Sequence, residues 1–288
     1  MIWDFLIAPF AEFGFMRRAL IGSLAICIGS VPVGVFLLLR RMSLTGDAMA
    51  HAILPGAAIG FLISGLSVMA MTIGGILAGL LVALLAGLVT RGTALKEDAS
   101  LAAFYLISLA FGVSLIAMNG STVDVFHVLF GSVLALNTAA LVLLATISSM
   151  TLVALAIFYR PLALECVDPG FLRSVSGFSA YTHFAFLALV VLNLVAGFQA
   201  LGTLMSVGIM IVPAAAARLW STAITGMILT AVIFAFASCI AGLLLSFHVS
   251  VPTGPAIIIS AGAIYVVSVV FGSEGGLISS RFLQPQQS

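Results

Sequence analysis

Long apolar runs follow one another along almost the whole chain and are separated by short polar stretches. A helix needs about 20 mainly apolar residues to cross the hydrocarbon core of a bilayer. Applied to this pattern, that length predicts spanning helices near residues 17–39, 47–66, 69–90, 98–118, 138–159, 181–198, 202–219, 222–247 and 252–272. The chain is therefore expected to be an all-α polytopic membrane protein with about eight or nine spanning helices, eight if one segment enters the membrane only partway.

The polar segments mark the ends and connections of one predicted transmembrane domain, residues 17–272. Residues 1–16 are expected to lie at the interface rather than form a cleaved signal peptide, because an acidic residue comes early and no small-residue cleavage pattern follows. Residues 121–137 are too short and polar to span and are expected at one membrane surface. Residues 159–179 are expected to form a cytoplasmic loop, and residues 273–288 a polar C-terminal tail.

Composition excludes a soluble domain and several kinds of function. Only 7% of the residues are charged, 63% are hydrophobic and the mean hydropathy is +1.34, whereas a soluble domain carries roughly 25% charged residues. The net charge of +1, with no basic tract, gives no indication of nucleic-acid binding. The sequence holds no phosphate-binding loop, metalloprotease motif or serine nucleophile motif. These features favour a transport component, not an enzyme, whose energy comes from a partner or an ion gradient.

Arginine and lysine determine the expected orientation, because they concentrate in short cytoplasmic connections. With the N-terminus outside and the C-terminus in the cytoplasm, only Arg17 and Arg18 fall on the outer side. The basic residues that then fall inside are Arg40, Arg41, Arg91, Lys96, Arg160, Arg173, Arg218 and Arg281.

Two titratable residues, Asp47 and His51, interrupt the second apolar run. Their spacing of four residues places them on one helix face, where they are able to bind one ligand together. Pro55 follows four residues later and has no N–H to donate to the carbonyl of His51. A carboxylate and an imidazole suit Zn²⁺, Mn²⁺ or Fe²⁺, and weak binding by two ligands suits a permeation path. The pair therefore predicts a transient metal contact.

Other interpretations of the pair stay open at this point. Asp47 follows Thr-Gly and is a candidate helix cap, and a lone His51 would then be a packing residue. Alternatively, Asp47 and His51 act as a relay in a proton- or ion-coupled secondary metal transporter, although a second Asp-x-x-x-His is absent from the sequence. An intramembrane enzyme has only this pair in its favour. Among the metals, the usual affinity order favours zinc over manganese or iron.

Six stretches, in order, resemble the permease subunits of bacterial zinc/manganese/iron ABC importers. The first is RRMSLTGDAMAHAILPGAAIGFL, which is similar to the family's Asp-Ala-x-x-His-Ala-x-Leu-Pro-Gly helix with its basic lead-in. The others are LKEDASLAAFY, DVFHVLFGSVLALN, VDPGFLRSVSGFSAY, LGTLMSVGIMIVPAAAARL and VPTGPAIIIS. Two positions depart from the family pattern: Gly170 replaces an acidic residue after Asp-Pro, and Ser132 replaces a frequent Asn.

This resemblance implies a type II ABC importer-like transmembrane domain in the bacterial inner membrane. It implies a second copy of the chain, two cytoplasmic ATP-binding subunits and an extracytoplasmic metal-binding protein as partners, with no permanently bound cofactor. By the same resemblance Asp47 and His51 contact the transported metal. The ATPase docking surface would map to Asp168, Pro169, Arg173 and Arg218. Gly170 puts in doubt any ATPase contact made through the family's acidic side chain.

The remaining polar residues are expected to have more ordinary roles. His127 and His248 lie near the outer face, where a role in metal uptake is a weaker alternative to an interfacial position. Glu97 and Asp98 complement a helix dipole at the start of a span. His183 is expected to be structural. Glu165 is expected in the cytoplasmic loop, either solvated or in contact with the ATPase.

Overall fold

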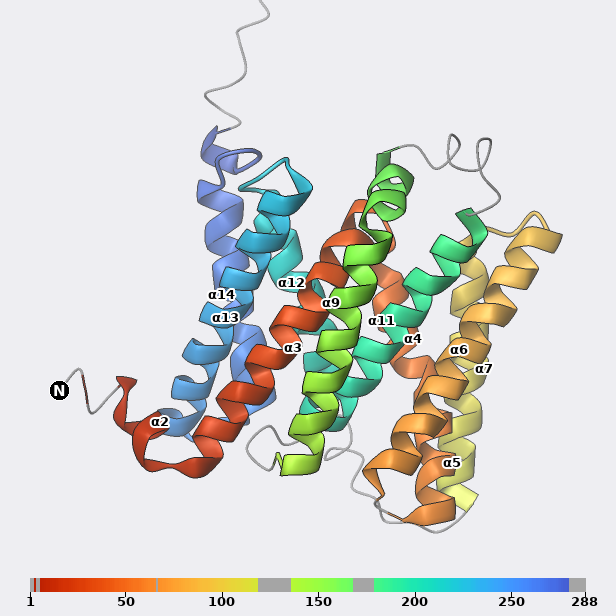
Figure 1. Ribbon diagram of the computed structural model, residues 1–288, viewed down its shortest axis with the longest axis horizontal. Coiled ribbons are helices and arrows are strands. Elements are labelled where there is room, and N and C mark those ends of the chain that lie inside the picture. Colours follow the sequence, from red (N-terminus) through yellow and green to blue (C-terminus); the bar gives the residue numbers. More distant parts are fainter. Residues whose placement is uncertain (1–2, 4–5, 66, 119–135, 168–178, 280–288) are drawn as a thin grey trace, which may run out of the picture.

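The computed structural model describes residues 3, 6–65, 67–118, 136–167 and 179–279, and every regular element in these ranges is a helix (Figure 1). The helices of the first half are α2 (Ala8–Glu12), α3 (Gly14–Leu39), α4 (Ser43–Ala52), α5 (Leu54–Ser64), α6 (Val68–Gly92) and α7 (Glu97–Met118). Those of the second half are α9 (Thr138–Val167), α11 (Ser179–Leu201), α12 (Thr203–Arg218), α13 (Ile224–Val249) and α14 (Thr253–Phe271). The predicted all-α fold is thus confirmed.

The helices pass back and forth between two ends of the molecule. In Figure 1, α3, α6, α9, α12 and α14 run toward the upper end, and α4 with α5, α7, α11 and α13 return. Within the described ranges, 8 helices are long and apolar enough to cross a membrane, taking α4 and α5 as one. The segment predicted at 202–219 forms the exception, because α12 has 16 residues, a length of about 24 Å against a hydrocarbon thickness of about 30 Å.

The α12 helix compensates for its short length by lying inside the bundle. It packs against α3, α11, α13 and α14, and most of its described side chains are buried. A helix in this position is surrounded by protein rather than lipid, so it does not need to match the thickness of the bilayer. The same helix delivers Arg218 to the upper end of the molecule.

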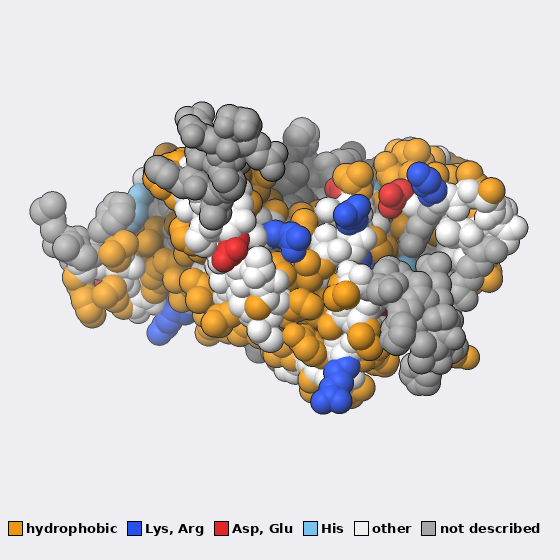
Figure 2. All heavy atoms as spheres, turned by 90° about the horizontal axis from the view of Figure 1, so that it is seen from above, with side chains coloured by type: hydrophobic (Ala, Val, Ile, Leu, Met, Phe, Trp, Pro, Cys, Tyr) orange, Lys and Arg blue, Asp and Glu red, His pale blue; other side chains and the backbone are white. Residues whose placement is uncertain are grey.

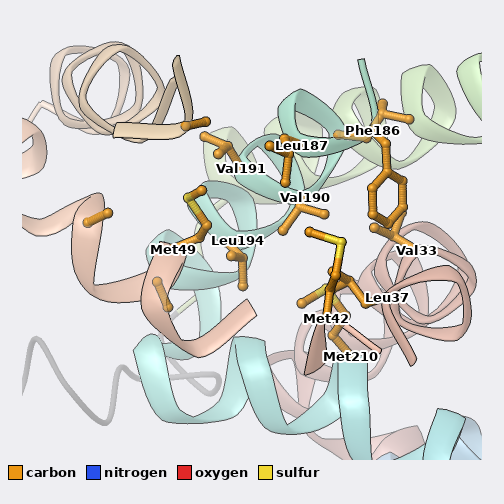
Figure 3. Packing of buried hydrophobic residues seen from close by; sticks show 14 of the residues in the cluster. Val33, Leu37, Met42, Met49, Phe186, Leu187, Val190, Val191, Leu194 and Met210 are labelled. Carbon is orange, nitrogen blue, oxygen red and sulfur yellow. The ribbon is translucent and has the colours of Figure 1, made fainter. Parts of the chain in front are cut away.

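Two apolar clusters form the core on either side of α3. One joins α3 to α9, α12, α13 and α14, with Val31, Val35, Ile209 and Leu243 fully buried. The other joins α3 to α4, α6 and α11, where Leu37, Met49, Val190 and Met210 come together (Figure 3). Because α3 contributes to both clusters, it is the central support to which α4 is attached.

Glycines allow the closest helix crossings. Gly34 of α3 lies against the backbone carbonyl of Met210 in α12, and Gly56 of α5 lies against the carbonyl of Gly74 in α6. A methyl group at either position would overlap a backbone atom, so only glycine permits these approaches. Small residues at helix interfaces are the usual means of close packing in membranes.

The end of α9 differs from the prediction. The helix continues through Pro161 to Val167, whereas the sequence pattern predicts a loop from residue 159. Glu165 is therefore helical and buried, with 6% of its side chain exposed, and the prediction of a solvated or ATPase-contacting Glu165 is wrong. The reason is a tertiary contact with Arg40, described below. Residues 121–135, most of the segment expected at a membrane surface, lie outside the described residues, as do residues 280–288 of the expected tail.

We expect Gly34→Ala to destabilise the protein by about 1–3 kcal/mol, because the new methyl group must displace the α12 backbone. The matched control is Gly262→Ala in α14, where an added Cβ meets nothing within 4 Å. This variant should keep or slightly raise the stability, since alanine favours a helix by up to about 1 kcal/mol over glycine. The measurement is the thermal unfolding midpoint in detergent; equal midpoints for the two variants would contradict the packing described here.

Candidate metal-contact site

Proline breaks the second span just below the candidate ligands. The α4 helix ends at Ala52, Ile53 forms a turn, and α5 begins at Leu54 with Pro55 in its first turn. The Ser108 hydroxyl of α7 donates a 3.0 Å hydrogen bond to the carbonyl of Ala52 at this break. In a continuous helix the carbonyl of Ala52 would accept a hydrogen bond from the next turn; here a side chain of a neighbouring helix donates instead. In apolar surroundings such a carbonyl needs a partner within the protein.

Asp47 and His51 lie on α4 as the spacing predicts. Asp47 Oδ1 and His51 Nε2 are 3.9 Å apart, which is too far for a hydrogen bond. Neither atom is therefore occupied by a hydrogen bond to the other. Asp47 is the fifth residue of α4, and Met42 occupies the N-cap position. The alternative in which Asp47 caps this helix is therefore excluded.

The imidazole of His51 is held by α7. It stacks on the ring of Tyr105, with 6.2 Å between ring centroids and 30° between planes. Its Nδ1 atom is buried and has no hydrogen-bond partner among the described residues. His51 is therefore oriented by an aromatic contact, and Nε2, on the side of Asp47, is the nitrogen that is able to bind another group.

The ligand-bearing side of α4 faces outward from the single chain, while the other side is packed. Asp47 is 64% exposed and His51 31% exposed, and Leu44, one turn earlier, is 80% exposed. Met49 and Ala52 are fully buried. A carboxylate that faced hydrocarbon would cost about 2.5–3.5 kcal/mol on insertion scales. This face consequently requires water or another protein surface against it.

One chain supplies only part of a coordination sphere. No group of three or more His, Cys, Asp or Glu side chains close enough to share a metal ion occurs within the described ranges. Asp47 and His51 provide one oxygen and one nitrogen ligand, the borderline set that divalent first-row metals accept. The site on a single chain is thus suited to brief contact rather than permanent retention of a metal.

The other residues predicted from the sequence lie elsewhere. Arg218 is exposed at the last turn of α12, with Nη1 3.9 Å from the sulfur of Met227. His248 is in the last turn of α13, in edge contact with Phe247. The remaining predicted docking residues and one histidine lie outside the described residues, namely Asp168, Pro169, Arg173 and His127.

Three polar residues near the α3–α4 corner were not predicted as a group: the side chains of Arg40 and Glu165 are buried, and His183 is half-buried. Arg40, Glu165 and His183 meet between α3, α9 and α11. Arg40 is 125 positions from Glu165 and 143 positions from His183 in the sequence, so no local spacing indicates the contact. Arg40 was assigned to a cytoplasmic connection by its charge alone.

Comparison with known proteins agrees with a membrane permease of the ABC transporter class. Residues 12–272 match the family model described as ABC 3 transport family. The chain belongs to this family, whose members here are transporter subunits rather than enzymes.

Curated relatives align over nearly the whole chain. The manganese transport system membrane protein MntC of Listeria innocua is 32% identical, covering 94% of this chain and 95% of that protein. The manganese import system permease protein ScaB of Streptococcus parasanguinis is 32% identical, covering 93% and 94%. The chelated iron transport system membrane protein YfeD of Yersinia pestis is 27% identical, covering 94% and 90%.

Solved structures share the architecture. PsaBC from Streptococcus pneumoniae, in complex with Fab, contains a chain with a TM-score of 0.84 and 30% identity, covering 98% of this chain and 99% of that one. An inward-facing conformation of a putative metal-chelate type ABC transporter gives a TM-score of 0.67 at 15% identity, covering 88% and 85%, and shows the fold alone. The predicted importer-like transmembrane fold is confirmed.

We expect Asp47→Asn to change the free energy of unfolding by less than about 1 kcal/mol, because exposed ion pairs contribute little. Thermal unfolding of the purified chain in detergent measures this, with Asp98→Asn at the exposed start of α7 as the control carboxylate. An exposed ion pair does not contribute more than about 2 kcal/mol to the free energy of unfolding. A larger loss of stability for Asp47→Asn, but not for Asp98→Asn, would therefore show that Asp47 has a structural role.

Proposed function

We propose that this chain is the membrane-spanning permease subunit of an ATP-driven importer of a divalent transition metal. The observation that carries the proposal is the Asp47/His51 pair on the outward face of α4, in a chain that belongs to the ABC 3 transport family. Neither residue is bonded to the other, and His51 is oriented by Tyr105. Both ligands are therefore available to a passing cation, and the imidazole is already oriented.

Manganese is the proposed cargo, with iron as the second choice. Carboxylate oxygen and imidazole nitrogen accept Mn²⁺, Fe²⁺ and Zn²⁺, so the ligands do not decide among them. The relatives at about one-third identity are named for manganese, and one further relative for chelated iron. The affinity order predicts zinc, but none of these relatives is named for zinc. We infer that the availability of the metal in the cell, rather than its affinity for the ligands, selects the cargo.

The proposed pathway lies between two copies of the chain. The outward face of α4 carries a carboxylate that needs cover, and Leu44 beside it is 80% exposed. Two copies related by a two-fold axis along this face would supply two aspartates and two histidines. Such a set completes the coordination that one chain offers only in part.

The energy source and partners follow from what the chain lacks and from its charge distribution. The sequence has no phosphate-binding loop, so ATP would be bound by separate cytoplasmic subunits, and an extracytoplasmic protein would deliver the metal. Figure 2 looks onto the end at which α3 and α14 finish, and Lys and Arg side chains are spread over it. We assign this end to the cytoplasm, with the N-terminus outside and the C-terminus inside.

The docking surface would include Arg218 and the segment with Asp168, Pro169 and Arg173. Arg218 ends α12, which packs along α3 and contacts α4. ATP binding by the partner would move this helix end and the segment that follows α9. Movement of α12 against α3 and α4 would then open or close the pathway beside Asp47 and His51, which is alternating access across the two-chain interface.

We expect cells that lack this chain to lose manganese when the metal is limiting, and wild type but neither Asp47→Asn nor His51→Ala to restore it. The total manganese, iron and zinc of each strain is measured by mass spectrometry. Asp98→Asn, which removes an exposed carboxylate elsewhere, should restore the metal fully. Full restoration by Asp47→Asn and His51→Ala would contradict the site, and a fall in iron or zinc alone would reassign the cargo.

A second candidate is a proton- or ion-coupled secondary transporter with Asp47 and His51 as the relay. The two mechanisms differ in their energy source. We expect manganese uptake to stop on ATP depletion and to continue when a protonophore is added with ATP held constant. Uptake that survives ATP depletion and collapses with the protonophore would support the relay and overturn the ATP-driven importer.

A further inference from the structure

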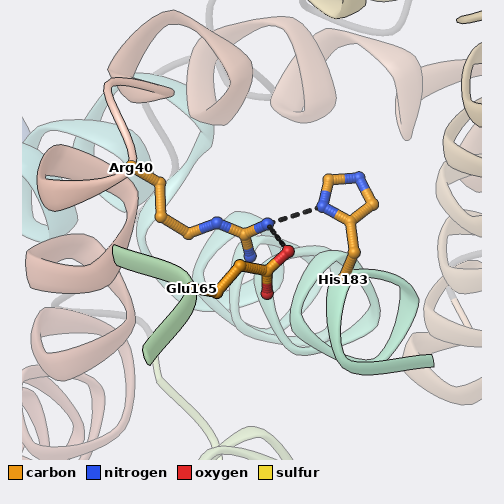
Figure 4. A network of polar contacts seen from close by, with 3 residues as sticks. All are labelled: Arg40, Glu165 and His183. Carbon is orange, nitrogen blue, oxygen red and sulfur yellow. Dashed lines mark hydrogen bonds and ion pairs between the residues drawn. The ribbon is translucent and has the colours of Figure 1, made fainter. Parts of the chain in front are cut away.

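A network of a buried ion pair and a half-buried histidine joins three helices at the end where α3 finishes (Figure 4). The guanidinium Nη2 of Arg40 donates to Glu165 Oε1 at 2.9 Å and to His183 Nδ1 at 2.6 Å. The side chains of Arg40 and Glu165 are 7% and 6% exposed. The Arg40 guanidinium also lies 4.7 Å from the centre of the Phe186 ring, a cation–π contact that closes its other side.

The chemistry of the donors defines the state of this network. A guanidinium has only donors, so Nδ1 of His183 must accept the hydrogen bond through its lone pair. Glu165 and His183 therefore both direct electron pairs at one nitrogen of Arg40. The arrangement depends on an uncharged acceptor at His183 and a negative charge at Glu165.

Stability alone is a weak reason for burying these charges. Removing an ion pair from water costs several kcal/mol per ion, and apolar residues of similar volume often serve equally well. In this network Arg40 Nη1 and Glu165 Oε2 are also buried without a hydrogen-bond partner among the described residues. A network that served only to stabilise the fold would be expected to have all of its buried polar atoms hydrogen-bonded. This network is therefore better explained by a role in specificity or switching.

Its location connects the two parts of the proposed mechanism. Glu165 is in the last turn of α9 and His183 in the first turns of α11, on the two sides of residues 168–178. Arg40 is the C-cap of α3, Arg41 follows in a left-handed turn (φ 59°), and α4 begins at Ser43. Because this turn is so short, the position of Arg40 determines where α4, with Asp47 and His51, begins.

We propose that Arg40, Glu165 and His183 form a coupling site that transmits movement at the α9–α11 corner to α4. These are positioning residues, since they contact neither the metal nor ATP. The proposal rests on the function proposed above, with the α9–α11 corner as part of the ATPase docking region. Loss of the network should leave ATP hydrolysis by the complex in place and separate it from metal movement.

The test uses the complex isolated through a tag on this chain and reconstituted in proteoliposomes with its metal-binding protein. Mn²⁺ uptake and ATP hydrolysis are measured together for Glu165→Gln, His183→Leu and His183→Asn. We expect the first two to lower the Mn²⁺ moved per ATP by at least about fivefold, the lower end of typical coupling between sites. His183→Asn, whose side-chain oxygen is able to replace Nδ1 as acceptor, should restore most of the ratio.

A variant without any buried charge keeps the test independent of folding. Arg40→Met with Glu165→Leu and His183→Leu replaces the network by apolar side chains and should match the wild-type unfolding midpoint. The coupling role predicts a stable complex with a low ratio. A wild-type ratio in this triple variant would overturn the proposal, because the network would then be only structural.

The matched control breaks a neutral link between the same two helices. Asn193 of α11 donates to Thr151 of α9 at 2.8 Å, and both residues are buried. The double variant Thr151→Val with Asn193→Leu should keep the wild-type amount of Mn²⁺ moved per ATP. If this ratio fell as much as in Glu165→Gln, any weakening of the contact between α9 and α11 would explain the effect, and the proposal would be overturned. A wild-type complex that hydrolyses ATP but moves no manganese, iron or zinc would overturn the proposed function itself.

Discussion

The requirement that backbone polar groups be bonded within the protein governs how this chain presents its ligands. Pro55 breaks the second span, and the Ser108 hydroxyl bonds to the carbonyl of Ala52 at the break. The short α4 helix is thereby separated from α5 and fastened to α7, whose Tyr105 also holds the ring of His51. Placing a carboxylate and an imidazole on the outward face of an apolar bundle depends on this local solution.

The two groups of polar residues near the start of α4 differ in their surroundings. Asp47 and His51 lie on an outward face, unbonded to each other, and need an additional surface to complete their surroundings. Arg40, Glu165 and His183 are enclosed by helices and bonded to one another. The turn after Arg40 places the two groups within a few residues on the chain, which is why we propose that movement at the enclosed group is passed to the open one.

The features that the sequence predicts correctly depend on local information. The length of each apolar run predicts the helices, and the four-residue spacing of Asp47 and His51 places both on one face of α4. The features that the sequence does not predict arise where distant segments meet. Glu165 was expected in a loop, yet α9 extends to include it, since a partner 125 positions away stabilises the helical position of its side chain.

The sequence by itself therefore determined the all-helical membrane fold, the approximate helix positions and the candidate ligands, because hydrophobic length and helical periodicity are local properties. Only the tertiary structure decided that α12 is a short helix buried in the bundle, that the ligand face of α4 is open, and that Arg40 joins Glu165 and His183. Burial and pairing arise from contacts between helices, and no pattern along one helix specifies which neighbour will cover it.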